Sequence, residues 1–319
     1  MLIAITMGDS SGVGPEIILQ GFKKQELPSD FIVIGDWSVM NFCNRLLKFD
    51  VPLRKIGDPL AWKCDAVNIL DLGLLQEADI KVGQLSRASG YAALKYVEHA
   101  TELALAKRIA AFVTMPINKE ATRLSEPEFT GHTEHIAKLC GQTNCTMMLA
   151  SDKLIVTHIS THVSLRKAID AVQTERIVNV IKLTHDALLK LRPRQRIAVA
   201  GLNPHAGESG AFGSEDEAQV APAVVCAAAQ GLDVHGPFPP DTIFMQAVKG
   251  KYDAVICMYH DQGHIPLKLL DFEGGINVTL GLPIMRTSVD HGTAFDIAYK
   301  GVAFTRSLRD ACALAVKLA

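Results

Sequence analysis

Short apolar runs rich in β-branched residues alternate along the chain with longer segments whose apolar positions recur at helical spacing. A strand-like run lies at 31–34. Helical patterns at 91–110 and 174–190 lead directly into further strand-like runs at 111–114 and 196–200. This alternation is typical of parallel strands joined by crossover helices. The chain is therefore predicted to have an α/β fold.

The length and the spacing of turn residues predict two lobes. With 319 residues, 48% of them hydrophobic, the chain can bury a sizeable core. Between 48 and 81 the pattern weakens and is punctuated by Pro52, Pro59 and Gly73, which suggests a hairpin-like excursion. No internal repeat and no flexible Gly/Ser linker separates two halves. Two lobes are therefore expected to connect tightly, with a cleft between them.

Charge and cysteine content restrict the class of partner. The 32 basic and 34 acidic residues give a net charge of −2, so no overall field favours nucleic acid or an anionic membrane. A small-molecule partner is expected. Seven cysteines without a Cys-x-x-Cys pair indicate free thiols in a reducing compartment. The opening residues have neither a basic n-region nor a long apolar stretch, and a cytoplasmic location is predicted.

Three polar motifs each follow an apolar strand-like run and each carries a histidine. The runs at 155–160, 197–202 and 254–258 lead into His162, His205 and His260. Ligands bind beyond the carboxyl ends of the strands in open α/β sheets, so these imidazoles can converge. Three neutral imidazoles suit a divalent ion such as zinc and leave positions open for substrate. For each of them, a hydrogen-bonded histidine near a strand end is the alternative.

His158 and the glycine-rich opening are each assigned a structural role. His158 lies inside the apolar run and is predicted to be a buried core residue. The opening at 8–16 places glycines between a strand and a helix, where backbone N–H groups can bind an anion. It lacks the third glycine of the dinucleotide fingerprint, and Pro15 suits the first helical turn. A structural strand-to-helix turn is therefore favoured over a cofactor cradle.

Further polar residues are candidates for binding an anionic substrate. His132 and Thr133 precede a helical pattern. Lys268, Asn277 and Arg286 recur at intervals of nine residues in a glycine-rich region that is predicted to be weakly helical. Arginine and lysine there could clamp an anion, although solvated loop charges are the alternative. The segment 287–294 is too rich in small polar residues to serve packing alone.

Five motifs in unchanged order resemble the 4-hydroxythreonine-4-phosphate dehydrogenase family, over nearly the whole chain. They are Met7-Gly8-Asp9 to Gly14-Pro15-Glu16, Gly131 to Glu134, Asn203 to Glu208, Met258 to Gly263, and Leu280 to Thr293. The resemblance implies a two-lobed α/β/α fold of the isocitrate and isopropylmalate dehydrogenase type, with a cleft between the lobes, and not a Rossmann fold. It also implies a homodimer whose active sites draw on both subunits.

The resemblance further implies roles for individual residues. It makes His162, His205 and His260 ligands of a divalent metal (Zn, Mg, Co or Mn), with Asp241 and Asp261 ordering the site. His132, Thr133, Lys268, Asn277 and Arg286 match positions that contact substrate. Asp290, His291, Gly292 and Thr293 look like the loop that binds NAD or NADP. Residues 1–125 with 275–319 would form the nucleotide-side lobe, and 126–274 the lobe for metal, substrate and dimerisation.

The motifs favour the branch of this family that acts on 4-phospho-D-threonate or 4-phospho-D-erythronate over the branch of pyridoxine biosynthesis. The opening Met7-Gly8-Asp9-Ser10-Ser11 and the stretch His264 to Lys268 depart from the biosynthetic pattern. The implied reaction is metal-dependent, NAD-linked oxidation of a 3-hydroxy acid followed by decarboxylation. The products are dihydroxyacetone phosphate, or 3-amino-1-hydroxyacetone phosphate from phosphohydroxythreonine. A metal-dependent hydrolase or aldolase and a non-catalytic sugar-phosphate sensor are the rival hypotheses.

Overall fold

The chain forms two compact units in a computed structural model that describes residues 1–272 and 274–319. The first unit comprises Met1–Thr143 and Leu282–Ala319, and the second comprises Asn144–Gly281. The chain thus leaves the first unit once and returns to it. The boundaries predicted at 125 and 274 lie too early, because helix α5 (His132–Leu139) packs on α3 (Arg87–Leu105) of the first unit.

The sheet of the first unit has six strands in the order β3-β4-β2-β1-β5-β12, and every neighbouring pair is parallel. The strands are β1 (Ile3–Thr6), β2 (Phe31–Gly35), β3 (Leu53–Ile56), β4 (Val67–Asp71), β5 (Ala111–Thr114) and β12 (Met285–Val289). Both β1 and β5 are buried along their whole length. Such strands read as continuous apolar runs because helices cover both faces of a parallel sheet.

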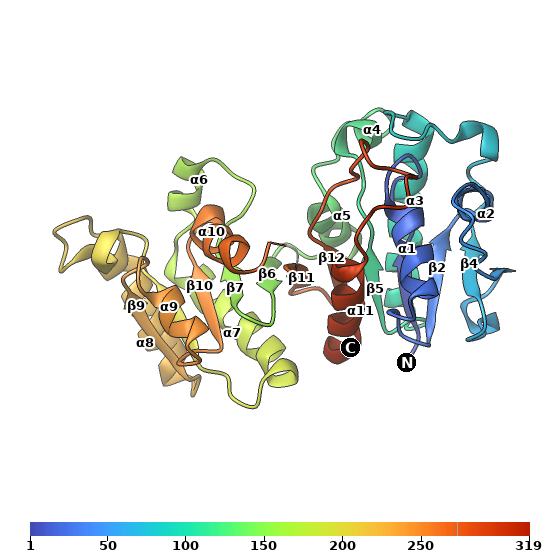
Figure 1. Cartoon of the computed structure of the whole chain (residues 1–319). Coiled ribbons are helices and arrows are strands. Elements are labelled where there is room, and N and C mark those ends of the chain that lie inside the picture. The colour runs from blue at the N-terminus through green and yellow to red at the C-terminus, as the bar shows by residue number, and fades with distance from the viewer. Residues whose placement is uncertain (273) are drawn as a thin grey trace. The chain divides into compact units, whose positions relative to one another are not determined.

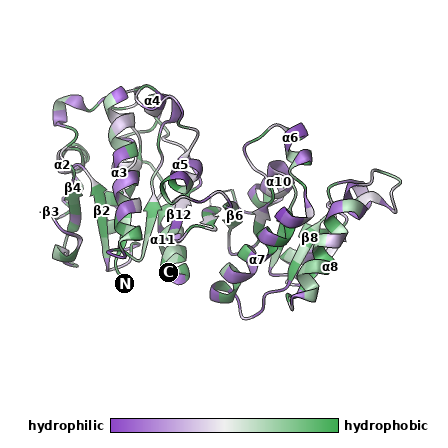
Figure 2. Ribbon diagram, turned by 180° about the vertical axis from the view of Figure 1, so that it is seen from behind, coloured by the Kyte–Doolittle hydropathy of each residue, from purple (hydrophilic) through white to green (hydrophobic). Residues whose placement is uncertain are grey.

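Helices flank this sheet and bury apolar residues against it (Figure 1, Figure 2). They are α1 (Gly14–Lys23), α2 (Trp37–Leu46), α3, α4 (Lys119–Arg123), α5 and α11 (Arg306–Leu318). Helix α3 contacts β1, β2 and β5 and buries Ala92, Ala93 and Ala100, whose small side chains allow close approach to the sheet. Its Tyr96 hydroxyl donates to the buried Asp36 carboxylate at 2.6 Å.

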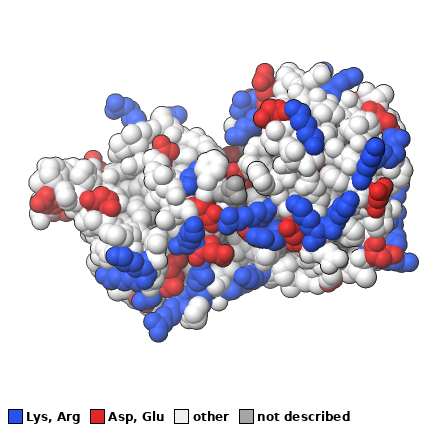
Figure 3. Space-filling model, viewed as in Figure 1, with Lys and Arg blue, Asp and Glu red and all other residues white. Residues whose placement is uncertain are grey.

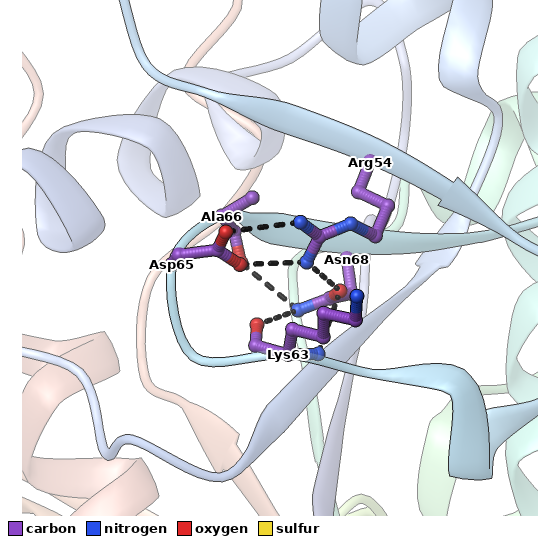
Figure 4. A network of polar contacts seen from close by, with 5 residues as sticks. All are labelled: Arg54, Lys63, Asp65, Ala66 and Asn68. Carbon is purple, nitrogen blue, oxygen red and sulfur yellow. Dashed lines mark hydrogen bonds and ion pairs between the residues drawn. The ribbon is translucent and has the colours of Figure 1, made fainter.

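The region between 48 and 81 is not a hairpin, which corrects the prediction from its turn residues. Strands β3 and β4 pair in parallel, with Leu53 beside Val67, so the chain must cross over between them. The buried Asn68 side chain holds this crossover: it donates to the carbonyls of Lys63 and Ala66 at 2.7 and 2.9 Å and accepts from the Lys63 N–H at 3.1 Å (Figure 4). Arg54 pairs with Asp65 beside it.

The second unit contains a mixed sheet in the order β11-β6-β7-β10-β8-β9. Its strands are β6 (Thr146–Ala150), β7 (Ile155–His158), β8 (Ile197–Ala200), β9 (Val234–Phe238), β10 (Ala254–Cys257) and β11 (Ile276–Leu280). Strand β6 runs antiparallel to β7 and β11, whereas β7, β10, β8 and β9 are mutually parallel. The three histidine motifs follow strands of this parallel part of the sheet.

Helices also pack on the sheet of the second unit (Figure 1). They are α6 (Leu165–Asp170), α7 (Thr174–Leu191), α8 (Ala221–Ala229), α9 (Ile243–Val248) and α10 (His260–Leu270). Leu149, Val156, Ala198, Val255 and Leu267 belong to one buried apolar cluster that ties α10 to the strands. The fold of each unit is α/β, as the alternation of patterns predicts.

The surface carries charges of both signs, as the net charge of −2 leads one to expect. Basic and acidic side chains are interspersed over the visible face in Figure 3. Among the helices within 1–272 and 274–319, none combines the length and the apolar character that a bilayer span requires.

Candidate functional site

The three histidine motifs start from three adjacent parallel strands. Strand β10 lies between β7 and β8, and His162, His260 and His205 follow the carboxyl ends of β7, β10 and β8. Neighbouring strands are about 5 Å apart, so the outer two ends are separated by about 10 Å. In both views α6, which follows His162, and α10, which begins at His260, occupy the same end of this unit (Figure 1, Figure 2).

His162 and His260 lie together. Their ring centroids are 5.7 Å apart. The Nδ1 of His260 is 2.6 Å from a carboxylate oxygen of Asp261, which can only accept, so this nitrogen carries the proton. The lone pair of His260 is therefore on Nε2, the arrangement found when a carboxylate orients a metal-binding imidazole. Asp261 thus has the orienting contact that was expected of it.

His205 stands apart from this pair. It begins a run of left-handed residues, with φ of 53° at His205, 54° at Ala206, 42° at Glu208 and 54° at Ser209. Its ring packs near Phe212, at 5.9 Å between centroids, and is exposed to solvent. Within the described part of the chain, no three His, Cys, Asp or Glu side chains are grouped closely enough to hold an ion. A single chain therefore assembles two of the three predicted ligands.

Buried polar residues hold the loops that carry these histidines. The Asp216 carboxylate accepts from the N–H groups of Leu202 and Asn203 at 2.8 and 3.0 Å, at the end of β8. The Gln262 side chain accepts from the Met258 N–H at 2.7 Å and donates to the Gly201 carbonyl at 2.8 Å. Gln262 therefore joins the end of β10 to the end of β8.

His158 and His264 form a buried pair beneath the metal-ligand candidates. His158 is fully buried and its Nδ1 contacts the Met147 carbonyl at 3.2 Å, so its predicted role as a hydrogen-bonded core residue is confirmed. Its Nε2 lies 3.2 Å from Nδ1 of His264, whose ring stacks on His260. Burial lowers the pKa of His158 to about 3, so the ring is neutral.

Arg286 is the centre of a second polar cluster, in the first unit. It lies in β12 and is 2% exposed. Its Nε and Nη2 donate to the Thr114 hydroxyl at 3.2 and 2.6 Å, and Nη1 is 3.5 Å from the Thr133 hydroxyl. Burial lowers the pKa of Arg286 to about 9, and the charge of Glu134 opposes that shift. A buried guanidinium bound to neutral hydroxyls is suited to attract an anion.

His132 adjoins this cluster as the first residue of α5. Its Nε2 is buried without a hydrogen-bond partner among the described residues. Burial and the nearby charges of Arg286 and Lys119 hold the pKa of His132 well below its usual range. A neutral imidazole with an unused buried nitrogen can donate to or accept from a bound ligand.

The expectation that Lys268, Asn277 and Arg286 share a weakly helical region is wrong. Lys268 lies in the last turn of α10, with its ammonium 5.3 Å from the Phe272 ring, while Asn277 lies in β11 and Arg286 in β12. The glycines that flank these residues mark turns between elements. The Asn277 side-chain oxygen is buried and lacks a hydrogen-bond partner in the described structure. Asp241 is exposed just before α9.

The glycine-rich opening uses its own N–H groups, which supports its role as a structural turn. The N–H of Ser11 donates to the Asp9 carboxylate at 2.8 Å, Gly12 donates to the Asp9 carbonyl, and Val13 donates to the Thr293 carbonyl. A Cβ on Gly12 would lie 2.7 Å from that carbonyl oxygen. Burial raises the pKa of Asp9, whose second oxygen has no partner in the described structure.

The segment Asp290 to Thr293 follows β12 and packs on this turn. Burial lowers the pKa of His291, and its Nε2 is buried without a described hydrogen-bond partner. A Cβ built on Gly292 meets open space. The segment thus offers a neutral imidazole nitrogen and room for a group beside it.

Reasoning from the sequence missed several residues that shape these clusters. Asp216 sits in an acidic stretch that reads as a solvated loop, and Thr114 ends an apolar strand, so neither carries a local signal. Gln262, Gly263 and His264 fall within the motifs that carry the family resemblance, but no individual role was predicted for them.

Comparison with known proteins places the chain among dehydrogenases. The family model described as pyridoxal phosphate biosynthetic protein PdxA matches residues 28–315. The D-threonate 4-phosphate dehydrogenase of Salmonella typhimurium is 44% identical over 322 residues, which cover 99% of this chain and 98% of that protein. A 4-hydroxythreonine-4-phosphate dehydrogenase structure from Klebsiella pneumoniae is 44% identical, covers 99% of each chain and superposes with a TM-score of 0.90.

A β-decarboxylating dehydrogenase from Thermococcus kodakarensis shares the fold at 13% identity, with a TM-score of 0.53 over 99% of this chain and 82% of that one. The predicted fold, that of the decarboxylating dehydrogenases and not the Rossmann fold, is thereby confirmed. The chain belongs to the family of the pyridoxal phosphate biosynthetic protein PdxA.

Proposed function

We propose that this protein is a metal-dependent, NAD-linked dehydrogenase that oxidises and decarboxylates D-threonate 4-phosphate to dihydroxyacetone phosphate. The observation that carries the proposal is the 44% identity, over essentially the whole length, to a relative named D-threonate 4-phosphate dehydrogenase. A hydrolase or an aldolase is not favoured, because relatives matched over their full length are named dehydrogenases.

The reaction balances without a further reactant. Hydride from C3 of the substrate reduces NAD, and the resulting ketone is β to the carboxylate. Loss of carbon dioxide from C1 and protonation at C2 then give dihydroxyacetone phosphate. The same steps on 4-phosphohydroxy-L-threonine would give 3-amino-1-hydroxyacetone phosphate, so C2 is the atom at which the two candidate substrates differ.

Arg286 and its neighbours would bind an anionic group of the substrate. The Thr114 and Thr133 hydroxyls contact the guanidinium, and a bound carboxylate or phosphate would gain a charge-assisted hydrogen bond from it. The unused Nε2 of His132 would add a directional contact to the same ligand. Asn277, with its buried unsatisfied oxygen, and Lys268 are proposed as further substrate contacts.

His162, His205 and His260 would hold the divalent ion, and Asp261 would fix the tautomer of His260. Such an ion polarises a hydroxyl or ketone oxygen and stabilises negative charge that develops there. Imidazole donors suit zinc better than magnesium or manganese, and we propose zinc. The segment Asp290 to Thr293 is proposed to bind the nicotinamide cofactor, NAD or NADP, through the buried His291 nitrogen and the space at Gly292.

The missing third ligand supports a homodimer with shared sites. His162 and His260 lie together, but no three candidate ligands are grouped within the described part of one chain, so a second copy is proposed to supply His205. The helix that carries His260 exposes Ile265 (56%) and Leu269 (83%), and Phe272 (74%) is exposed just after its end. A second copy would cover such a patch.

The substrate assignment is tested by reduction of NAD, followed at 340 nm with the zinc-loaded protein. D-threonate 4-phosphate, D-erythronate 4-phosphate and 4-phosphohydroxy-L-threonine are compared at equal concentration. We expect the highest kcat/KM for D-threonate 4-phosphate and one equivalent of dihydroxyacetone phosphate per NADH. A higher kcat/KM for the amino substrate would refute the substrate assignment, and no NAD reduction with any of the three would refute the dehydrogenase.

The shared site is tested by mixing inactive chains. A mixed dimer of His205→Ala and His260→Ala has one site with all three wild-type ligands, so about a quarter to a half of the wild-type activity should return. The matched control is His162→Ala mixed with His260→Ala, which alters both sites and should stay inactive. Mixed dimers of the first pair that form, as shown by native mass, yet remain inactive would place all ligands on one chain.

A further inference from the structure

We propose that His158 and His264 form a support of two imidazoles that fixes the orientation of the His260 ring for metal binding. The inference rests on the proposed metal-dependent function. His264 and His158 are positioning residues: they act through His260 and need not touch the ion.

The proton positions follow from the hydrogen bonds. The Met147 carbonyl can only accept, so Nδ1 of His158, 3.2 Å away, carries a proton. With its proton on Nδ1, the His158 ring accepts at Nε2, and the partner within reach is Nδ1 of His264 at 3.2 Å. The same His264 proton also faces the His260 carbonyl at 3.0 Å. The Met147 carbonyl thus places the proton of His158 on Nδ1, and the two acceptors that face Nδ1 of His264 favour a proton there.

The stacking contact between His264 and His260 restricts the orientation of the His260 ring. The rings of His264 and His260 are stacked, with centroids 3.5 Å apart and planes inclined by 12°. On its Nδ1 side, His260 is held by Asp261 at 2.6 Å, but Asp261 is 69% exposed and such a contact alone is weak. The buried ring of His264 supplies a rigid flat surface that the exposed carboxylate cannot.

The packing of α10 against β7 at Gly263 leaves room for His158 and His264. A Cβ on Gly263 would lie 2.6 Å from Nε2 of His158 and 2.9 Å from the Cys257 sulfur. Only a glycine there lets α10 approach β7 closely enough for the two imidazoles to meet. Two polar rings within an otherwise apolar layer are costly unless they are hydrogen-bonded. Leucine and valine would fill the same space without that requirement, so a role beyond packing accounts better for the pair.

Two variants of His264 separate the ring contact from the hydrogen bond. His264→Asn places an amide N–H where Nδ1 was and keeps the bond to His158, but it removes the stacked ring. His264→Phe keeps a flat ring against His260 but leaves Nε2 of His158 buried without a donor. We expect His264→Asn to have the larger effect on metal affinity and His264→Phe the larger effect on the unfolding midpoint.

The measurement is the dissociation constant of the dimer for Zn²⁺ and Co²⁺, by competition with a chromophoric chelator, together with thermal unfolding of the metal-free protein. His264→Asn should raise the dissociation constant about 10- to 100-fold, the usual effect of removing a group that orients a ligand. His264→Phe should raise it less. His185→Asn, on α7, changes a histidine outside the ring contacts that join His158, His264 and His260; it is the control and should leave metal affinity unchanged.

The outcomes are distinct. The inference is overturned if both His264 variants bind metal as the wild type does, or if metal affinity falls in the same order as the unfolding midpoint. A wild-type protein that binds neither ion would overturn the proposed function and this inference with it. Nitrogen-15 spectra of the metal-free protein give a separate test: an Nε2-protonated His264 would contradict the support whatever the metal does.

Discussion

The Thr114→Val variant tests whether Arg286 depends on a neutral hydroxyl for its position. Valine has nearly the same shape as threonine, so the change removes the acceptor and leaves the packing in place. Two N–H groups of Arg286, at 3.2 and 2.6 Å from the hydroxyl, lose their acceptor in a side chain that is 2% exposed. Because its pKa of about 9 keeps the guanidinium charged at pH 7, the donors cannot be neutralised by losing a proton.

The expected cost follows from the burial of these donors. A buried donor without a partner costs about 1–3 kcal/mol, and more when it is charged, so Thr114→Val should lower the free energy of unfolding by about 2–3 kcal/mol. Thr184→Val is the matched control. The Thr184 hydroxyl is equally buried but donates to the Val180 carbonyl of its own helix, and its loss should cost about 1 kcal/mol.

Urea unfolding at pH 7 measures both variants, and an Arg286→Met background completes a double-mutant cycle. With the guanidinium gone, Thr114→Val should be nearly neutral, because both partners are then apolar. The reasoning is refuted if Thr114→Val costs no more than Thr184→Val, or if its cost is the same with and without Arg286. If Arg286 binds the substrate anion as proposed, Thr114→Val should raise the KM for substrate more than it lowers kcat, because that contact would be made in the ground state and in the transition state.

Three further changes test other parts of the structure. Asn68→Ala should destabilise the protein by about 2–3 kcal/mol in urea unfolding, because the backbone groups of Lys63 and Ala66 lose their hydrogen-bond partner at the crossover to β4. A cost under about 1 kcal/mol would count against that role. Gly263→Ala gains up to about 1 kcal/mol of helix propensity but places a methyl group 2.6 Å from His158, and overpacking of about 1–3 kcal/mol should outweigh the gain. A Gly263→Ala protein that is more stable than the wild type would contradict this expectation. The folded state lowers the pKa of His132, so only the unfolded chain protonates this imidazole as the pH falls below about 6.5. The free energy of unfolding should therefore fall by up to about 1.4 kcal/mol for each pH unit below that value. This part of the pH dependence of stability should be absent in His132→Gln. If the slope of stability against pH is the same in the variant and the wild type, the expected shift in the pKa of His132 is wrong.

Local sequence patterns determine much of this protein. The alternation of apolar runs and helical patterns was enough for an α/β fold, because burial on both faces of a parallel sheet leaves continuous β-branched runs. The same runs located the strand ends that carry His162, His205 and His260, which β7, β8 and β10 confirm. The structural role of His158 was also legible, since a single imidazole inside an apolar run has to be hydrogen-bonded.

Other features depend on which strands become neighbours, and no local pattern encodes that. Turn residues between 48 and 81 suggested a hairpin, yet β3 and β4 are parallel, because prolines and glycines mark where a chain turns but not how far it crosses over. The interval of nine residues between Lys268, Asn277 and Arg286 is an accident of one helix followed by two strands.

In the candidate sites, too, some contacts follow from neighbouring residues in the sequence and others depend on the fold. Asp261 follows His260 in sequence and could be identified from it, whereas Thr114 reaches Arg286 from 172 residues away. His264 reaches His158 across 106 residues and is close to it only because Gly263 lets α10 approach the sheet. Residue types specify which chemistry is available, but the distances between residues far apart in sequence come from strand order and close packing, and these are properties of the whole fold.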